Sequence, residues 1–337
     1  MRSHISGRND SYAMIPAMKI YILVVDDVFD TGLSTLLDTF GIANELAAMG
    51  GDPACRFDVQ LLSVRKHIRT SHGFTVPVAP ASGLDRPDVV LVPAMGAKMP
   101  EQVRAALQRK EVADIGKILK GWADGGSMIA AACTGTFMLA NAGLLDGHSA
   151  TTSWWLAPLF RELFPVVKLD ESHMLVNSAN RITAGAALGH LDLALWLVRS
   201  ISPALAAMTA RYLVIEPRPS QAAFVIPDHL AHTDPVVERF EQWARGKLAE
   251  GFLLSEAAKA TGTSERTLAR RLRAVLGKTP LSYFQDLRVE RAVHLLQTSS
   301  ASIDQIASQV GYADGVTLRT LLRRKIGRGV RELRSRQ

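Results

Sequence analysis

The chain has 337 residues, a length that favours two domains with a hydrophobic core in each. Hydrophobic residues make up 47% of the sequence and charged residues 21%, which is typical of a globular protein and excludes a disordered one. No apolar run approaches the roughly 18 residues that a membrane-spanning helix needs, so we expect a cytoplasmic protein with no membrane partner.

Net positive charge is confined to the last third of the sequence. Residues 234–337 contain 19 lysines and arginines against 11 acidic residues, whereas residues 1–233 contain 20 against 21. A basic domain beside a neutral one favours a polyanion as the partner of the basic part, although a solvated basic surface would have the same composition.

Two other features exclude further classes of protein. Cys55 and Cys133 are too few for a disulfide framework and lack metal-ligand spacing, so we expect reduced thiols, no bound metal and no cofactor. Residues 1–17 are polar and lack the apolar stretch of a secretion signal, and we interpret them as a flexible extension.

The first two thirds of the sequence alternate between strand-like and helix-like segments. Strands are predicted at Lys19–Val25, Arg56–Val64, Pro87–Ala94 and Ser127–Ala132, and helices at Ser34–Met49 and Pro100–Asp124. This alternation predicts an α/β domain with a parallel sheet that is covered by helices on both faces. Ligands bind such sheets at the carboxyl ends of the strands, where this sequence has Asp26, Asp27, the loop Pro93–Gly96 and Cys133.

Cys133 lies where the fourth predicted strand meets a helix predicted over Thr134–Ala142. Such a turn projects a side chain above the end of the sheet, and the first amides of the helix stabilise a thiolate there. A catalytic nucleophile is one interpretation of this cysteine, and a small buried hydrophobe or a redox sensor are the others. Asp26 and Asp27 either orient a cationic ligand or cap the first helix.

A proline-rich stretch, Ile215–Pro235, separates this region from the basic one and predicts a partly extended linker. We therefore expect a sensor domain over residues 18–213, a linker over 214–234 and a second domain over 235–337.

The second domain contains an internal repeat. Leu254–Gly277 matches Ile303–Gly327, with alanines, glycines and leucines at corresponding positions. Each copy predicts a short helix, a turn at Gly262 or Gly311 and a second helix, which is the helix-turn-helix pattern. Between the copies, Pro280–Ser299 predicts one long helix that holds them at a fixed spacing.

The second helix of each copy has polar side chains opposite its leucine face. These outward residues are Arg266, Arg270 and Arg273 in the first copy, and Thr317, Thr320, Arg323 and Arg324 in the second. We expect the arginines of the first copy to contact guanines, the threonines to contact thymine methyls or base edges, and the last two arginines to contact phosphates. Lys325 falls near the apolar side, and we expect its amine to reach out to solvent.

Two segments of this region, PLSYFQDLRVERAVHLL and IDQIASQVGYAD, resemble the AraC-type DNA-binding domain, and the resemblance extends over about Pro235–Leu333. It implies an all-α domain that binds double-stranded DNA, with RNA polymerase as a further partner. Family members usually have aromatic residues where this sequence has Leu318 and Leu322, so the packing differs in detail.

The stretch ACTGTFMLANAGLLDGHSATT resembles the glutamine-amidotransferase-like superfamily, in the branch of the intracellular-protease type and the GlxA-type regulators, over about Met18–Tyr212. The resemblance implies a flavodoxin-like parallel sheet, a homodimer and a small nitrogenous metabolite as effector. In enzymes of this superfamily a histidine commonly follows the two threonines and activates the cysteine. That position is Ser153 here, and a serine hydroxyl cannot act as a base near neutral pH.

We therefore predict a DNA-binding transcriptional regulator that is not an enzyme. The predicted ligand pocket comprises Asp26, Asp27, Gly96, Cys133, Thr134 and Ser153. The alternative is a cysteine-dependent hydrolase or amidase with an appended DNA-binding domain. The two differ in whether a base lies within reach of Cys133, and His148, His173 and His190 stay open as candidates for that base.

Overall fold

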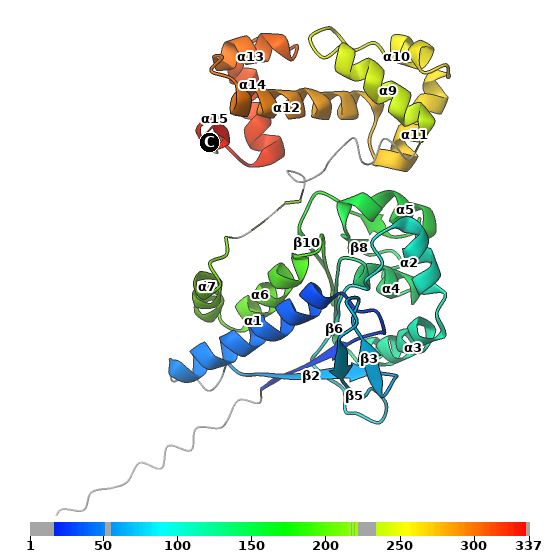
Figure 1. The fold of residues 1–337 in the computed structure, drawn as a ribbon, viewed down its shortest axis with the longest axis vertical. Coiled ribbons are helices and arrows are strands. Elements are labelled where there is room, and N and C mark those ends of the chain that lie inside the picture. Colours follow the sequence, from blue (N-terminus) through cyan, green and yellow to red (C-terminus); the bar gives the residue numbers. More distant parts are fainter. Residues whose placement is uncertain (1–16, 51–54, 217, 219, 222–233, 335–337) are drawn as a thin grey trace, which may run out of the picture. The chain divides into compact units, whose positions relative to one another are not determined.

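The computed structural model describes residues 17–50, 55–216, 218, 220–221 and 234–334 (Figure 1). The contacts divide them into two compact units, one from the described parts of 1–144 and 177–218 and the other from those of 145–176 and 219–337. The predicted extension, except for its last residue, and most of the predicted linker lie outside the described residues, so the domain limits remain predictions. No helix in these ranges is long and apolar enough to cross a membrane.

Parallel strands form the centre of the α/β part, as the alternation of elements predicts. Within the described residues, seven strands make one sheet in the order β10-β11-β7-β6-β1-β2-β5. Their bounds are Met18–Leu23 (β1), Phe57–Ser63 (β2), Ala79–Pro80 (β5), Val89–Val92 (β6), Met128–Ala132 (β7), Leu175–Ser178 (β10) and Arg181–Ala184 (β11). The neighbouring pairs from β11 to β5 are all parallel, which confirms the predicted α/β class.

Helices cover both faces of this sheet (Figure 1). One group comprises α1 (Asp30–Met49), α6 (Gly189–Ile201) and α7 (Pro203–Tyr212), and the other α2 (Pro100–Leu107), α3 (Lys110–Asp124) and α4 (Gly135–Asn141). The single helix predicted over Pro100–Asp124 is wrong, because Arg109 has extended backbone angles (φ −64°, ψ 136°) and separates two helices. Helix α1 begins at Asp30 rather than at Ser34.

Several short elements have no signal in the periodicity of the sequence, because each is too short to show one. They are β3 (His67–Arg69), β4 (Thr75–Pro77), β8 (Ser149–Ala150), β9 (Lys168–Leu169), the 3₁₀ helix η1 (Trp154–Leu156) and α5 (Ala157–Leu163). Strands β3 and β4 form an antiparallel hairpin.

The C-terminal part of the described chain is helical throughout. Its helices are α9 (Pro235–Gly246), α10 (Leu254–Ala260), α11 (Glu265–Leu276), α12 (Pro280–Thr298), α13 (Ile303–Gln309), α14 (Gly315–Ile326) and α15 (Val330–Arg334). The pairs α10–α11 and α13–α14 are the two predicted helix-turn-helix units, and α12 is the predicted connecting helix. Gly262 and Gly311 occupy the turns with φ of +69° and +77°, a conformation that favours glycine.

Two separate hydrophobic clusters stabilise these helices. The first includes Phe240, Leu268 and Leu272 and also takes in the N-terminal half of α12. The second includes Leu318 and Leu322, together with the C-terminal half of α12. Both of these leucines are fully buried, so they fill the position of the aromatic residues that the AraC resemblance leads one to expect.

The two turn glycines allow a matched test of this packing. A Cβ at Gly262 meets nothing within 4 Å, whereas a Cβ at Gly311 meets the Arg288 guanidinium and lies 2.5 Å from the Leu248 carbonyl oxygen. We expect Gly262→Ala to lower the free energy of unfolding by about 1–2 kcal/mol through backbone strain alone. We expect Gly311→Ala to lose about 1–3 kcal/mol more, because the added methyl group also displaces its neighbours. Urea denaturation measures both values, and equal losses would contradict this account of the second turn.

Candidate functional site

Cys133 occupies a sharp turn between β7 and α4. Its φ is +55°, in the left-handed region, and its side chain is only 5% exposed. A Cβ at Gly135 would collide with the Val92 carbonyl oxygen and lie 2.8 Å from that of Pro93, so α4 begins directly against the end of β6. The predicted strand-to-helix turn is therefore present, and it places the thiol at the carboxyl edge of the sheet.

The loop Pro93–Gly96 after β6 is tied to three other elements at this edge. Thr134 Oγ1 donates to the Met95 carbonyl oxygen at 3.0 Å. The Phe29 amide donates to the Ala94 carbonyl oxygen at 2.8 Å, and the Gly96 amide donates to that of Asp27 at 2.6 Å. These bonds bring the β1–α1 loop, the β6 loop and the start of α4 together.

His190 also contacts this loop, and both of its ring nitrogens are hydrogen-bonded. The Ala94 amide donates to Nε2 at 3.0 Å, and Nδ1 lies 2.7 Å from the Ala187 carbonyl oxygen, which can only accept. Nδ1 therefore carries the proton, and Nε2 has no lone pair left for a thiol proton. Complete burial lowers the pKa of His190 to about 4. The structure thus excludes His190 from the role of base for Cys133.

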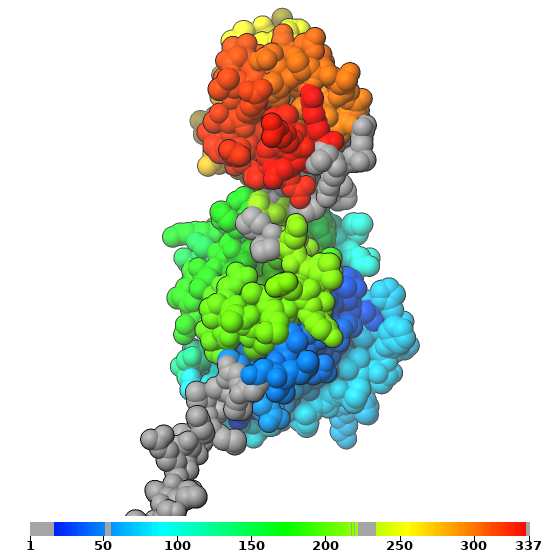
Figure 2. All heavy atoms as spheres, turned by 90° about the vertical axis from the view of Figure 1, so that its left-hand side faces the viewer, coloured from blue at the N-terminus to red at the C-terminus, as the bar shows by residue number. Residues whose placement is uncertain are grey.

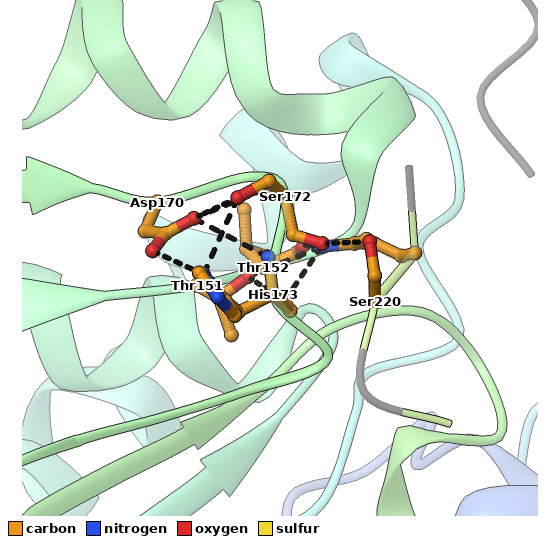
Figure 3. A network of polar contacts seen from close by, with 7 residues as sticks. Thr151, Thr152, Asp170, Ser172, His173 and Ser220 are labelled. Carbon is orange, nitrogen blue, oxygen red and sulfur yellow. Dashed lines mark hydrogen bonds and ion pairs between the residues drawn. The ribbon is translucent and has the colours of Figure 1, made fainter. Parts of the chain in front are cut away.

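Figure 3 shows the polar contacts around Thr151 and Thr152, the two residues before Ser153 in the sequence. Thr151, Thr152 and Ser153 are completely buried. Gln221, also buried, donates through Nε2 to Thr151 Oγ1 at 3.1 Å and to the Thr152 carbonyl oxygen at 2.9 Å. Gln221, from the predicted linker, therefore bonds to the two threonines that directly precede Ser153.

His173 lies in the same network and bonds to Asp170 (Figure 3). Its Nδ1 is 2.7 Å from Asp170 Oδ2, and Ser172 Oγ donates to Asp170 Oδ1 at 2.7 Å. Burial raises the pKa of Asp170, but the hydrogen bonds with Ser172 and His173 outweigh it and hold the pKa below its ordinary value. His148, His173 and Ser153 all belong to the second compact unit, so a role for them beside Cys133 remains a hypothesis from the sequence.

A cavity of about 380 Å³ opens beside Asp27 in the first unit. Its lining residues are Asp27, Ser71, His72, Gly96, Ala97, Lys98 and Gln102. Burial raises the pKa of Asp27, although the Arg109 guanidinium acts against it. Asp30 holds one wall in place, since its Oδ2 accepts from Ser71 Oγ at 2.6 Å and lies 2.8 Å from His72 Nδ1.

Asp27 and Gly96 are the residues of the predicted pocket that line this cavity. Asp26 has a structural role instead, because its carboxylate accepts from the Arg69 amide at 2.8 Å and pairs with Arg65 at 3.2 Å. Neither Asp26 nor Asp27 caps α1, whose N-cap is Phe29. Cys133 and Thr134 are not among the lining residues.

The other side chains that line the cavity were not predicted from the sequence. Ser71 and His72 come from the β3–β4 hairpin, and Lys98 and Gln102 from the loop before α2 and its first turn. Their proximity to Asp27 depends on contacts between distant segments, and no motif in the sequence marks it.

The outward faces of the two recognition helices, α11 and α14, are exposed as predicted. This holds for Arg266, Arg270, Arg273, Thr317, Thr320, Arg323 and Arg324. Arg266, Arg270 and Arg273 follow one another at i, i+4 and i+7, and so share one stripe of α11.

In α14 the equivalent stripe consists of Val316, Thr320 and Arg323, and the side chain of Val316 is 67% exposed. This valine was not predicted from the sequence, although an apolar residue among the outward polar ones is a signal that could have marked it. Thr317 is bonded to Asp314, the N-cap of α14, since its amide donates to Asp314 Oδ1 at 2.7 Å and its hydroxyl to Oδ2 at 3.2 Å. The expectation that the Lys325 amine reaches solvent is wrong, because it pairs with Asp286 of α12.

The burial of the neutral His190 ring should make the stability of the fold depend on pH. Because the pKa of about 4 in the folded protein lies below the ordinary histidine value of 6.5, the neutral ring contributes its full stabilisation above pH 6.5. Below that pH His190 binds a proton in the unfolded chain but stays neutral in the folded one. The free energy of unfolding therefore falls by up to about 3 kcal/mol as the pH falls towards 4. Urea denaturation as a function of pH should therefore show a weaker dependence in His190→Gln. His67→Gln, at an exposed histidine, is the matched control, and identical pH profiles for His190→Gln and wild type would disprove this assignment.

Known proteins match both parts of the chain. Residues 18–199 match the DJ-1/PfpI family, and residues 257–336 match a helix-turn-helix domain. The HTH-type transcriptional regulator ArgR of Pseudomonas aeruginosa is 31% identical over 225 residues, which cover 66% of this chain and 68% of that protein. The regulator GbdR of the same species is 27% identical over 299 residues, or 87% of this chain and 77% of that protein.

A crystal structure from Vibrio parahaemolyticus has the same fold in the first part. It superposes with a TM-score of 0.50 at 19% identity and covers 59% of this chain and 100% of that one. The family match covers more than half of the chain. The protein therefore belongs to the DJ-1/PfpI family and carries an AraC-type helix-turn-helix domain after the family domain.

Proposed function

We propose that this protein is a cytoplasmic transcriptional regulator whose two recognition helices bind double-stranded DNA and whose first domain binds a small nitrogenous effector. The observation that carries this proposal is the duplicated helix-turn-helix unit, in which both recognition helices expose a stripe of mainly polar residues opposite a buried leucine face. Helices of this kind enter the major groove. One protomer is then expected to contact two DNA elements about one helical turn, roughly 10 base pairs, apart.

The two stripes differ in the contacts they offer to DNA. Three arginines on α11 suit bidentate bonds to guanine, whereas Val316 and the Thr320 methyl group on α14 suit thymine methyls. Arg323 and Arg324 follow towards the end of α14, where we assign them to phosphates. We therefore attribute most of the sequence reading to the first helix-turn-helix unit.

The cavity beside Asp27 is the proposed effector site. It is lined mainly by polar side chains and presents a carboxylate, which favours a ligand with a positively charged nitrogen. Lys98 Nζ lies 5.7 Å above the Phe29 ring at the same edge, so an anionic group on the ligand would also find a partner. The relatives ArgR and GbdR are named as transcriptional regulators. For this chain, control by an effector is part of the proposal.

Cysteine-dependent hydrolysis is the second candidate, because the left-handed backbone of Cys133 is the geometry of a nucleophile on a sharp turn. Two observations favour the regulator. Both ring nitrogens of His190 are committed, and Ser153 stands where the related enzymes have a histidine. The fold itself is shared with enzymes, so we base this choice on the residues and not on the fold.

A homodimer is the proposed assembly, and RNA polymerase is a further proposed partner. Helix α7 exposes Met208 (48%) and Tyr212 (70%), and Val214 follows it with 90% exposure. Figure 2 faces this surface, with α7 in light green and α1 in blue beside it. Exposed apolar side chains that gather in this way favour association.

Two arginine variants test the DNA-binding mode. Arg270→Ala should cost about 1–3 kcal/mol of binding and relax the preference at one base pair, whereas Arg324→Ala should weaken all sequences alike and lower the salt slope by about one. Binding to matched and mismatched duplexes at several salt concentrations measures this difference. Cys133→Ala is the control, and it should bind DNA like the wild type. Equal, sequence-independent losses for both arginine variants would show that the reading face of α11 is assigned wrongly.

A substitution that fills the cavity tests the proposed effector site. A Cβ at Gly96 would lie 2.5 Å from Ser71 Cβ and 2.7 Å from Asp27 Oδ1, so Gly96→Ala should close the cavity. A thermal-shift screen with amino acids and quaternary amines should give a compound that raises the melting temperature of the wild type, because it binds only the native state. Gly96→Ala should lose that shift, and Gly41→Ala, whose Cβ meets nothing within 4 Å, should keep it. A shift that survives in Gly96→Ala would place the site elsewhere.

A further inference from the structure

The two recognition helices belong to different hydrophobic cores. Helix α11 packs in the first cluster and α14 in the second, and within the described residues the two clusters have no member in common. Helix α12 runs through both. The orientation of α14 relative to α11 therefore depends on α12 and on the contacts that each half makes with it.

One side chain of α12 contacts both recognition helices or their immediate continuation. Asp286 Oδ2 lies 3.0 Å from Nζ of Lys278, which follows the glycine that ends α11. Its other oxygen, Oδ1, pairs with Nζ of Lys325, in the last turn of α14. The Asp286 side chain is only 20% exposed, so water screens these two pairs incompletely.

The charges explain why one shared carboxylate is effective there. The C-terminal ends of α11 and α14 both carry partial negative charge, which favours a lysine at each end. Both ammonium groups approach the same carboxylate and would repel each other without it. An isolated surface ion pair contributes little to stability, but a partly buried carboxylate between two cations constrains the position of both.

A second residue of α12 supports the same junction. Arg288 Nε donates to the Leu248 carbonyl oxygen at 2.9 Å in the first half. Its guanidinium lies 4.8 Å from the centre of the Phe284 ring and 5.4 Å from that of Tyr312, which belongs to the second half. Arg288 thus joins the halves by a hydrogen bond and by its guanidinium between two aromatic rings, whereas Asp286 joins the ends of the recognition helices by ion pairs.

We propose that Asp286 is a positioning residue that fixes the orientation of α14 relative to α11, and thereby the spacing of the two DNA elements that one protomer binds. This inference rests on the proposed DNA-binding function. Asp286 itself lies on the connecting helix and need not touch DNA for this role. Its loss should leave each helix-turn-helix unit able to bind its own element and should loosen the coupling between the two.

The test uses the full-length protein and a duplex that the wild type selects from a random-sequence library. Duplexes with one element scrambled, and duplexes with one base pair added or removed between the elements, complete the set. Asp286→Asn should bind the single-element duplexes like the wild type and should lose about tenfold in affinity for the two-element duplex. Its preference for the native spacing over the shifted spacings should also decrease.

Two variants separate positioning from a general loss of structure. Asp286→Glu keeps the charge and should restore most of the spacing preference. Glu290→Gln lies on the same helix but pairs with Arg245 of α9 in the first half, so it should leave that preference unchanged. Circular dichroism and urea denaturation check that each variant is folded.

The outcomes separate the inference from the function on which it rests. If Asp286→Asn keeps the wild-type preference for the native spacing, the inference is wrong and the DNA-binding function stands. If Asp286→Asn binds the single-element duplexes more weakly while it remains folded, Asp286 acts within one unit and the inference is also wrong. If the wild type selects no two-element duplex, the proposed mode of DNA binding fails first.

Discussion

The buried loop Pro93–Gly96 is the segment on which the functional edge of the first unit depends. Backbone amides and carbonyls that are removed from water must be hydrogen-bonded, and here the partners come from elsewhere in the chain. His190 accepts from the Ala94 amide, and Thr134 donates to the Met95 carbonyl oxygen. The hydrogen bonds to the backbone of this loop hold α4, α6 and the β1–α1 loop around it. The sharp turn and the cavity are formed by these same segments.

The same packing also accounts for the sharp turn at Cys133. Gly135 packs so tightly against the end of β6 that the chain must turn sharply immediately before it, and Cys133 takes the left-handed conformation. The strain of such a residue is of the order of 1–3 kcal/mol and has to be offset by the surrounding packing. Packing therefore accounts for the turn, and the geometry of the turn does not by itself decide between an enzyme and a regulator.

In the described helical part, the two helix-turn-helix units have separate hydrophobic clusters, so other contacts must fix their relative placement. Each unit buries its own leucines, and the long helix α12 contributes one half to each cluster. Polar contacts from α12 then connect the halves, through Asp286 and Arg288. Directional charged contacts suit this task, since the relative placement of two helices is more sensitive to them than to apolar area alone.

The sequence by itself determined the elements and the repeat. Apolar runs and helical spacing located four strands of the sheet, and corresponding glycines and leucines revealed both helix-turn-helix units, because these signals are local and periodic. Only the tertiary structure decided which side chains meet: that Ser71 and His72 join Asp27, that His190 is committed on both nitrogens, and that Lys325 pairs with Asp286 rather than with water. Such partners lie far apart in the chain, and their burial and charge follow from packing that no local pattern encodes.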